Sequence, residues 1–292
     1  MIDMKLIRDA DRAEITRYLK DNPTRICEST FGVVYLWNVN GDGLYEIKDG
    51  TLYLANEREG AMCFSYPIGG EDERALDEIV NYCKKNGKRL RFRFLSEEQS
   101  KIIEGKFGVK CNTDRDWSDY IYDAEELKRL SGKKFHGQKN HLNRFLKDHP
   151  DYEFLPYSEE LSEKADKFFD RYYAEVDKDD DIFRDEKRVF KRIIENFADS
   201  GQQGGVLLVD GEIVAISIGE VAGDTLYVHF EKALREYSGS YAAINYLFAN
   251  RYCGDAKYIN REEDVGDEGL RIAKTSLHPV MILDKFFAEV EL

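Results

Sequence analysis

The chain has 292 residues, of which 42% are hydrophobic and 13% aromatic, and its formal net charge is −14. This apolar content supports a packed core and excludes a disordered protein, and the sequence has no unbroken apolar run of about 18 residues to span a membrane. The acidic balance argues against nonspecific binding to nucleic acid or anionic lipid, because long-range repulsion opposes both.

The N-terminus is charged from its third residue onward and has no apolar signal core, so we expect a cytoplasmic protein. No pair of cysteines has metal-ligand spacing, and the five histidines form no HExxH pattern. The five cysteines are therefore interpreted as reduced thiols, and no metal site is expected: Cys27, Cys63, Cys83, Cys111 and Cys253.

The first part of the chain predicts a helix, a strand meander and then alternating helices and strands. A helix is expected over residues 5–20, ended by Asn22-Pro23, before an apolar segment at 31–38. Asp49-Gly50 lies between two alternating runs and is a strong hairpin signal. The further elements expected are strands at 44–47, 51–54 and 62–67, a helix from Gly69-Gly70 to Asn86-Gly87, a strand at 89–95, a helix at 97–107 and a strand at 117–122.

The same order of elements recurs in the second part of the chain. Two helices, at 159–176 and 185–199, are joined by the acidic link Asp177–Asp181. The elements that follow are strands at 206–209, 213–221 and 226–233, a helix from 238 to 252, a strand at 257–259, a helix at 265–275 and a strand at 280–290. We therefore expect a duplicated α+β topology of mixed sheets flanked by helices, with an N-terminal half at 1–123, a basic connecting helix at 124–150 and a C-terminal half at 151–292.

Each half of this plan resembles the GNAT acyltransferase fold, in which a strand meander leads into a glycine-opened helix. The start of such a helix offers free N–H groups and the positive end of a dipole to an anion. In the first half the helix begins with three carboxylates at 71–73, which would repel an anion. We therefore expect the anion at the second turn, although an ordinary helix cap at Ser238 would give the same pattern: Ser238, Gly239, Ser240 and Tyr241.

A basic segment, Lys128–Lys147, holds seven Lys or Arg residues and no carboxylate. It is expected to be helical, with interruptions near Gly132 and Gly137. A local cationic segment on an acidic chain favours one specific anion rather than a polymer. The candidate donor-binding residues here are Lys133, Lys134, Lys139, Asn143 and Arg144.

Alternation along the strand 226–231 places Tyr227, His229 and Glu231 on one face. Such a group could deprotonate an amine or hydroxyl nucleophile, although a solvent-facing strand would show the same spacing.

Charged residues are concentrated in Tyr258–Pro279, directly after a short apolar strand. Arg271 and Lys274 are three residues apart, on one face of a helical turn. A solvated loop capped by Asp264 or Asp267 is the alternative interpretation. The cluster that follows the strand consists of Asn260, Arg261, Glu262, Glu263 and Asp264.

Three stretches together resemble the catalytic C-terminal region of bacterial phosphatidylglycerol lysyltransferases and their stand-alone relatives. These are Gly132–Phe145, His229–Gly239 and Asn260–Pro279, of which the third is the most specific. The likeness covers about residues 25–290, and the order of elements is similar to the tandem GNAT, or Fem-type, architecture of that family.

The resemblance implies transfer of an activated acyl group, which in the lysyltransferases is an aminoacyl group moved from charged tRNA to a lipid hydroxyl. We expect no counterpart of their membrane-embedded N-terminal part. Gln138 departs from the family, whose members often have a second basic residue beside Lys139, and this weakens the expected contact with a tRNA acceptor end. Attack is expected to be direct, since no Cys or Ser lies in a nucleophile motif.

We therefore expect an acyl or aminoacyl transferase with a pocket where the two halves meet, lined by Lys139 and Arg271. The candidates for the general base, or for the group that holds the acceptor, are Glu231, His229, Glu263 and Asp264. Charge on the carbonyl oxygen would be neutralised by Arg261, Arg271 and Lys274. The substrate would be contacted by Asn260, Arg261 and Glu262. The donor is either aminoacyl-tRNA or acyl-coenzyme A, and the alternatives are an acyl-coenzyme A-dependent N-acyltransferase or a non-catalytic binding module on a degenerate transferase fold.

Overall fold

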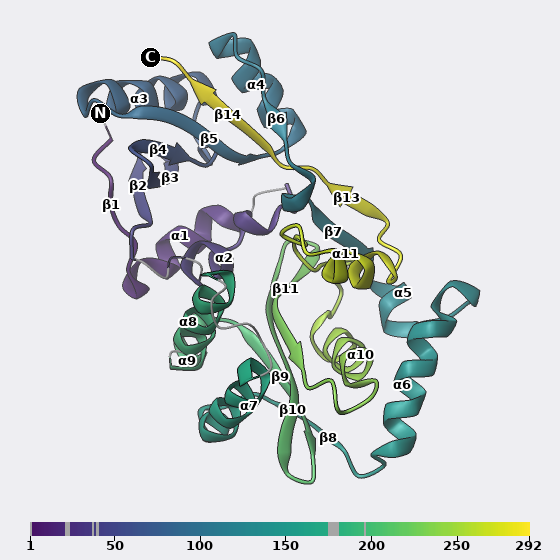
Figure 1. Cartoon of the computed structure of the whole chain (residues 1–292). Helices are drawn as coiled ribbons and strands as arrows, with labels where there is room; N and C mark the ends of the chain where they lie inside the picture. Colours follow the sequence, from purple (N-terminus) through teal and green to yellow (C-terminus); the bar gives the residue numbers. More distant parts are fainter. Residues whose placement is uncertain (1, 21–23, 37, 39–40, 175–180, 196) are drawn as a thin grey trace. The chain divides into compact units, whose positions relative to one another are not determined.

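The computed structural model describes residues 2–20, 24–36, 38, 41–174, 181–195 and 197–292 (Figure 1). Their strands form two seven-stranded mixed sheets flanked by helices, which confirms the expected α+β class. The chain forms two compact units. The first unit is Met1–Asp119, Glu263–Asp267 and Ile282–Leu292, and the second unit is Tyr120–Glu262 and Glu268–Met281.

The sheet of the first unit is an antiparallel meander extended by one parallel pair. Its strand order is β1 (Lys5–Leu6), β2 (Leu44–Lys48), β3 (Thr51–Arg58), β4 (Ala61–Phe64), β5 (Arg89–Leu95), β14 (Phe286–Val290) and β6 (Asn112–Thr113). β4 and β5 run parallel and are connected by helix α3 (Asp72–Lys85). The hairpin between β2 and β3 is confirmed, with positive φ at Asp49 and Gly50 as a two-residue hairpin turn requires.

The remaining helices of the first unit are α1 (Arg12–Leu19), α2 (Phe31–Leu36) and α4 (Glu97–Phe107). The helix expected from residue 5 starts only at Arg12, because Lys5 and Leu6 pair with β2 as a short strand. The expected break at Asn22-Pro23 includes residues outside the described part. The core lies where α3 packs on the sheet, with Leu76 and Ile79 in the same buried cluster as Phe64 and Phe92.

The sheet of the second unit repeats this plan. Its strand order is β13 (Met281–Leu283), β7 (Asp119–Asp123), β12 (Tyr258–Asn260), β11 (Thr225–Ala233), β10 (Glu212–Ala222), β9 (Gln203–Val209) and β8 (Glu153–Pro156). Strands β8 to β11 are antiparallel, and β11 and β12 run parallel, connected by helix α10 (Ser240–Tyr252). In both units, therefore, a meander feeds a helix that leads to a parallel strand, which is the expected duplication.

The units are not contiguous in sequence, in contrast to the halves expected at 1–123 and 151–292. The reason is an exchange of strands. β7 follows the helices of the first unit but pairs with β12 in the second sheet, and β14 at the end of the chain pairs with β5 in the first. Long-range pairing of this kind leaves no local signal in the sequence.

The basic segment of the second unit folds as α5 (Ala124–Arg129), the 3₁₀ turn η4 (Lys133–Phe135) and α6 (His136–Asp148). The interruption expected near Gly132 is present, with a φ of 88° at that residue, whereas Gly137 lies inside α6 without a break. α6 packs against α10, and Leu142 and Phe145 share a buried cluster with Ile244 and Phe248. This packing places α6 beside the start of α10.

The other helices of the second unit are α7 (Ser162–Ala174), α8 (Asp181–Glu195), α9 (Phe197–Ser200) and α11 (Glu268–Thr275). Most of the expected acidic link Asp177–Asp181 lies outside the described residues. Nowhere in the described part of the chain is there a helix of the length and apolarity that crossing a lipid bilayer requires.

Candidate functional site

A cavity of about 400 Å³ lies at the start of α10 in the second unit. Its walls come from α6, β11, the turn before α10, the residue after β12, and the end of α11. Of these, α6, β11 and α11 are seen around α10 in Figure 1. The polar side chains that line it with the turn Tyr237–Tyr241 are Gln138, His141, Glu231, Arg235, Asn245, Arg261 and Ser276. All of the lining residues belong to the second unit.

The turn before α10 depends on Gly239. This residue has a φ of 88°, and a Cβ there would lie 2.2 Å from the carbonyl oxygen of His141, so only glycine allows α6 and α10 to approach. The hydroxyl of Ser240 donates to the carbonyl of Leu234 at 3.0 Å. Among the described residues no side chain caps α10; the N–H of Ser240 donates to the carbonyl of Tyr237 at 2.9 Å, so only the later amides of the first turn remain uncapped beside the cavity.

Glu231 on β11 and Arg261 after β12 form an ion pair in the cavity wall. Nη2 of Arg261 lies 2.5 Å from Oε1 of Glu231, and the hydroxyl of Ser217 is 3.5 Å from Oε2. The side chains are 6% and 15% exposed, respectively. Burial raises the pKa of Glu231 above its ordinary value, although Arg261 acts in the opposite direction. The cavity therefore contains a carboxyl group that holds a proton more tightly than a surface glutamate.

Lys274 supports the Glu231–Arg261 pair through the backbone of Arg261. It is buried, and its Nζ donates to the carbonyl oxygen of Arg261 at 2.7 Å. The carbonyl of Lys274 accepts from the hydroxyl of Tyr122 at 2.8 Å. Lys274 thus fixes the backbone of Arg261 and does not itself line the cavity. Arg271, on the same short helix, is half-buried and is also absent from the lining.

Within the basic segment, Gln138 and His141 line the cavity, whereas its lysines and arginines do not. Nε2 of Gln138 donates to the carbonyl of Ser276 at 3.0 Å, which ties α6 to the end of α11. Five candidate residues of this segment are exposed at the surface, where Lys134 pairs with Glu126 and Arg144 with Asp148: Lys133, Lys134, Lys139, Asn143 and Arg144.

His229 lies between two carboxylates. Its Nδ1 is 2.7 Å from Oε1 of Glu262, and its Nε2 is 2.9 Å from Oε1 of Glu220. Burial alone would lower the pKa of His229, but the two hydrogen-bonded carboxylates outweigh it and raise the pKa to about 10. The backbone N–H of Glu262 donates to Oδ1 of the buried Asn260 at 2.7 Å. His229 is thus an imidazolium with both nitrogens occupied, and Asn260 and Glu262 belong to the same supporting group.

We expect His229→Gln to remove a pH dependence of stability. Because the pKa of His229 is about 10 in the folded chain and roughly 6.5 when unfolded, its stabilisation is complete below pH ~6.5 and is lost as the pH rises through about 10. Urea unfolding across that window should show a decline in the free energy of unfolding that is absent from the variant. The exposed His136→Gln is the matched control, and equal slopes in wild type and His229→Gln would contradict this assignment.

Glu263 and Asp264 belong to the first unit. Oε2 of Glu263 lies 3.2 Å from Nζ of Lys285. The buried Asp264 lies 3.5 Å from Nη1 of Arg115 and accepts from the N–H of Gly266 at 3.0 Å. The charged cluster after β12 is therefore divided, with Asn260–Glu262 at the second unit and Glu263–Asp264 among the side chains of the first.

The model of the phosphatidylglycerol lysyltransferase C-terminal domain matches residues 20–289 of this chain. The chain belongs to that family. A conserved protein of unknown function from Bacteroides thetaiotaomicron is 32% identical, with both chains covered completely and a TM-score of 0.94. An uncharacterised protein of Mycoplasmoides gallisepticum is 22% identical over 178 residues, which span 59% of this chain and only 56% of that relative.

Two further solved structures share the fold of this lysyltransferase family member. L-PGS from Bacillus licheniformis is 14% identical over 95% of this chain and 91% of its own, with a TM-score of 0.68. A tandem GNAT protein from the clavulanic acid biosynthesis pathway is 9% identical over 100% of this chain and 99% of its own, with a TM-score of 0.51. These likenesses confirm the tandem GNAT-like architecture.

Five polar residues that line the cavity outside the turn before α10 were not among the sequence candidates: Gln138, His141, Arg235, Asn245 and Ser276. Asn245 follows Tyr241 by four residues on α10, and helical spacing from the turn could have identified it. His141 follows Gln138 by three residues on α6 in the same way. Arg235 lies in the loop after β11, and no regular spacing in the sequence relates it to the other residues of the cavity.

A second charged cluster in the family member surrounds Lys285 in the first unit. Its Nζ lies 2.7 Å from Glu28, 2.8 Å from Asp119 and 3.2 Å from Sγ of Cys27. Ligand atoms of Cys27, Asp119 and Glu263 lie within 4.8 Å of one another, close enough to share a metal ion. The ammonium group of Lys285 already occupies the position of the cation in this cluster, and we assign it a structural role.

Proposed function

We propose that the second unit is an acyl or aminoacyl transferase whose donor places its activated carbonyl in the cavity at the start of α10. The acceptor, an amine or hydroxyl, attacks that carbonyl directly. The observation that carries the proposal is the Glu231–Arg261 pair, which combines a proton acceptor and a cationic hydrogen-bond donor in one cavity wall.

Glu231 would act as the general base. A carboxyl group with a raised pKa is a better proton acceptor near neutral pH than an ordinary glutamate. As the new bond forms between the acceptor nitrogen or oxygen and the acyl carbon, its proton passes to Glu231. The bond from that carbon to the donor's oxygen or sulfur breaks, and Glu231 can return the proton to the leaving group.

Arg261 would stabilise the negative charge that develops on the carbonyl oxygen. Its Nε is buried and has no hydrogen-bond partner among the described residues. A buried N–H without a partner is costly in a resting protein, and a preorganised donor of this kind is what an oxyanion requires. Lys274 holds the backbone of Arg261 in place, so the donor does not need to reorganise during the reaction.

The surface of α6 supports aminoacyl-tRNA as the donor. Gln138 and His141 of α6 line the cavity. Lys139 and Arg144 on the same helix, and Lys133 just before it, are exposed. An acyl end in the cavity would thus place the phosphates that precede it near these cations. The family model is that of a lysyltransferase, which agrees with an aminoacyl donor.

The uncapped start of α10 supports acyl-coenzyme A as a second candidate donor. First-turn amides beside a cavity are suited to a pyrophosphate, and those that follow Ser240, whose own N–H donates to the carbonyl of Tyr237, would supply them. A conventional acyl-coenzyme A N-acyltransferase would use the same Glu231–Arg261 pair, so the two candidates differ only in the donor.

Radiolabel transfer distinguishes these donors. The full chain is incubated with a charged tRNA pool or with labelled acetyl-coenzyme A, together with a mixed lipid and amine extract as acceptor. We expect label to move from charged tRNA. Transfer from acetyl-coenzyme A alone would replace the leading donor with the second one, and failure of both donors to bind would contradict the proposal and favour a non-catalytic binding module.

A further inference from the structure

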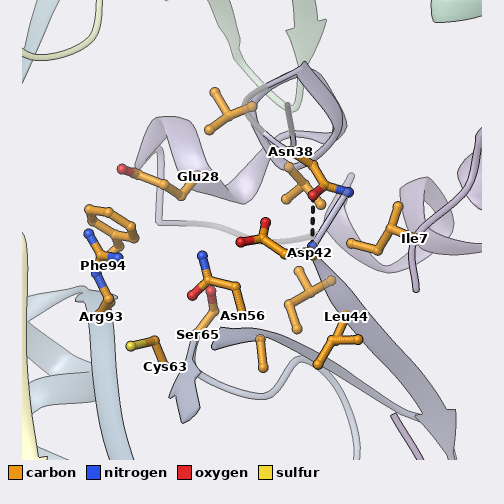
Figure 2. Close-up of a pocket in the computed structure, with 15 residues that line it drawn as sticks. Ile7, Glu28, Asn38, Asp42, Leu44, Asn56, Cys63, Ser65, Arg93 and Phe94 are labelled. Carbon is orange, nitrogen blue, oxygen red and sulfur yellow. Dashed lines mark hydrogen bonds between the residues drawn. The ribbon is translucent and has the colours of Figure 1, made fainter. Parts of the chain in front are cut away.

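The first unit contains a smaller cavity of its own, of about 150 Å³. It lies where the parallel strands β4 and β5 end. Their pairing stops at Phe64 and Phe92, and the next residues along the chain, Ser65 and Arg93, line the cavity. Figure 2 shows the carboxylate of Asp42 and the amide of Asn56 turned into this space, with Arg93 and Phe94 at its edge.

The polar side chains that line this cavity are not all engaged in ion pairs or hydrogen bonds. Arg93 has no carboxylate within ion-pair distance in the described part of the chain, and its guanidinium lies 4.7 Å from the centre of the Phe94 ring. The side chains of Asn56 and Ser65 likewise make no hydrogen bond to another described residue. The half-buried cation of Arg93, whose protein partners are the Cys63 thiol and the Phe94 ring, is available to a ligand together with an amide and a hydroxyl that have no hydrogen-bond partner in the described residues.

A negative group faces the same space. Asp42 contacts Arg58 at 3.3 Å on its outer side, and a carboxylate has further lone pairs to accept from other donors. Glu28 also lines the cavity, and its carboxylate contacts Lys285 at 2.7 Å. The cavity wall thus offers one cation without an ion-pair partner, Arg93, and two carboxylates. Asp42 would repel a purely anionic ligand, and Arg93 would repel a purely cationic one. A ligand that carries both charges therefore fits the wall best.

The backbone at the edge of the cavity is strained. Phe94 has a φ of 56°, a conformation that a bulky residue rarely adopts. Its ring contacts Trp117 and Phe287 at centroid distances of 5.9 and 5.4 Å, and these contacts hold it in place. Strained residues held by their surroundings concentrate at binding sites, and here the strain is directly adjacent to Arg93.

The volume limits the size of the ligand. At roughly 30 Å³ per water molecule, 150 Å³ is the volume of about five waters, which is enough for a small amino acid because covalently bonded atoms occupy less space than separate waters. A nucleotide or a coenzyme is too large. Acidic residues at the start of α3, Asp72 and Glu73, also disfavour a phosphate at the helix that connects β4 and β5.

We infer that the cavity of the first unit binds a small free α-amino acid, such as glycine, alanine or serine, as its zwitterion. Arg93 and the hydroxyl of Ser65 hold the carboxylate, and Asp42 and the amide oxygen of Asn56 hold the ammonium group. This site is separate from the cavity at the start of α10 and does not depend on the proposed transferase activity.

Isothermal titration calorimetry of the full chain tests this inference. Glycine, alanine and serine are titrated, with acetate and ethylamine as ligands that carry only one of the two charges. At least one amino acid should bind, and acetate and ethylamine should each bind at least tenfold more weakly, because each loses one charge-assisted contact. The inference is overturned if none of the three amino acids binds, or if acetate binds as tightly as glycine.

Variants locate the site. Arg93→Gln and Asp42→Asn should each weaken binding about tenfold or more, since each removes one charged partner of the zwitterion. Arg89→Gln is the matched control, because Arg89 lies on the same strand but is exposed and paired with Glu289. Circular dichroism checks that each variant is folded, and Asp42→Asn provides the test should Arg93→Gln unfold. Wild-type affinity in both folded variants would contradict the assignment.

Discussion

Replacing Glu231 by glutamine is expected to lower the rate of acyl transfer by about 10²- to 10⁴-fold, which is the usual contribution of a positioned general base. Glutamine keeps the size of the side chain but cannot accept a proton from the attacking amine or hydroxyl. The rate of label transfer from the active donor, measured at saturating donor, checks this expectation. Binding of the donor should change far less than the rate, because the proton moves only in the reaction.

Glu212→Gln is the matched control, since Glu212 is an exposed glutamate on the neighbouring strand β10. It should transfer label at the wild-type rate. Glu231→Gln also leaves Arg261 without its carboxylate, so thermal unfolding must show that the variant is folded before its rate is interpreted. A folded Glu231→Gln variant with the wild-type rate would exclude Glu231 as the base.

Replacing Lys285 by methionine is expected to destabilise the first unit by about 3–5 kcal/mol, the usual cost of removing one partner of a buried charge network. Lys285 is fully buried, and its ammonium group contacts Glu28, Asp119 and Glu263. Burial alone would lower the pKa of Lys285, but these acidic neighbours raise it well above its ordinary value. Without the ammonium group, the carboxylates repel one another in a largely buried site.

Urea unfolding of wild type and Lys285→Met measures this loss. The difference should shrink as the pH is lowered, because the carboxyl groups left behind take up protons and lose their repulsion. Burial already raises the pKa of Glu28 to about 8, so this group should protonate first. Lys101→Met, which removes an exposed surface pair with Glu97, should cost well under about 1 kcal/mol. A similar small cost for Lys285→Met would show that the cluster contributes little to stability.

Local patterns in the sequence predicted most elements of the fold. The hairpin at Asp49-Gly50, the helix opened by Gly69-Gly70 and the recurrence of the meander in the second part are all present. These signals depend on neighbours along the chain, which the sequence shows directly.

Alternation on β11 predicted Tyr227, His229 and Glu231 on one face, which is wrong, because the pairing with β10 passes from Ile218–Phe230 to Gly219–Val228 and skips His229. This bulge breaks the alternation, so Glu231 lines the cavity next to Ser217, whereas His229 contacts Glu220 and does not line the cavity.

The exchange of β7 and β14 between the sheets could not be predicted, because strand pairing over such separations has no local signature. For the same reason the cluster Asn260–Asp264 was treated as one site, although its members belong to different units. Spacing placed Arg271 and Lys274 on one helical face. It could not show that Lys274 is buried against a backbone carbonyl, which only the packing of α11 determines.

The most direct test of the central claim is hydrogen exchange of the full chain with and without an aminoacyl-adenosine that carries a non-hydrolysable amide linkage. If the acyl end of the donor lies in the cavity of the second unit, backbone amides of 237–245 and of the segment around Arg261 should exchange more slowly when the analogue is bound. Unchanged exchange in these segments, with protection confined to other parts of the chain, would contradict the account.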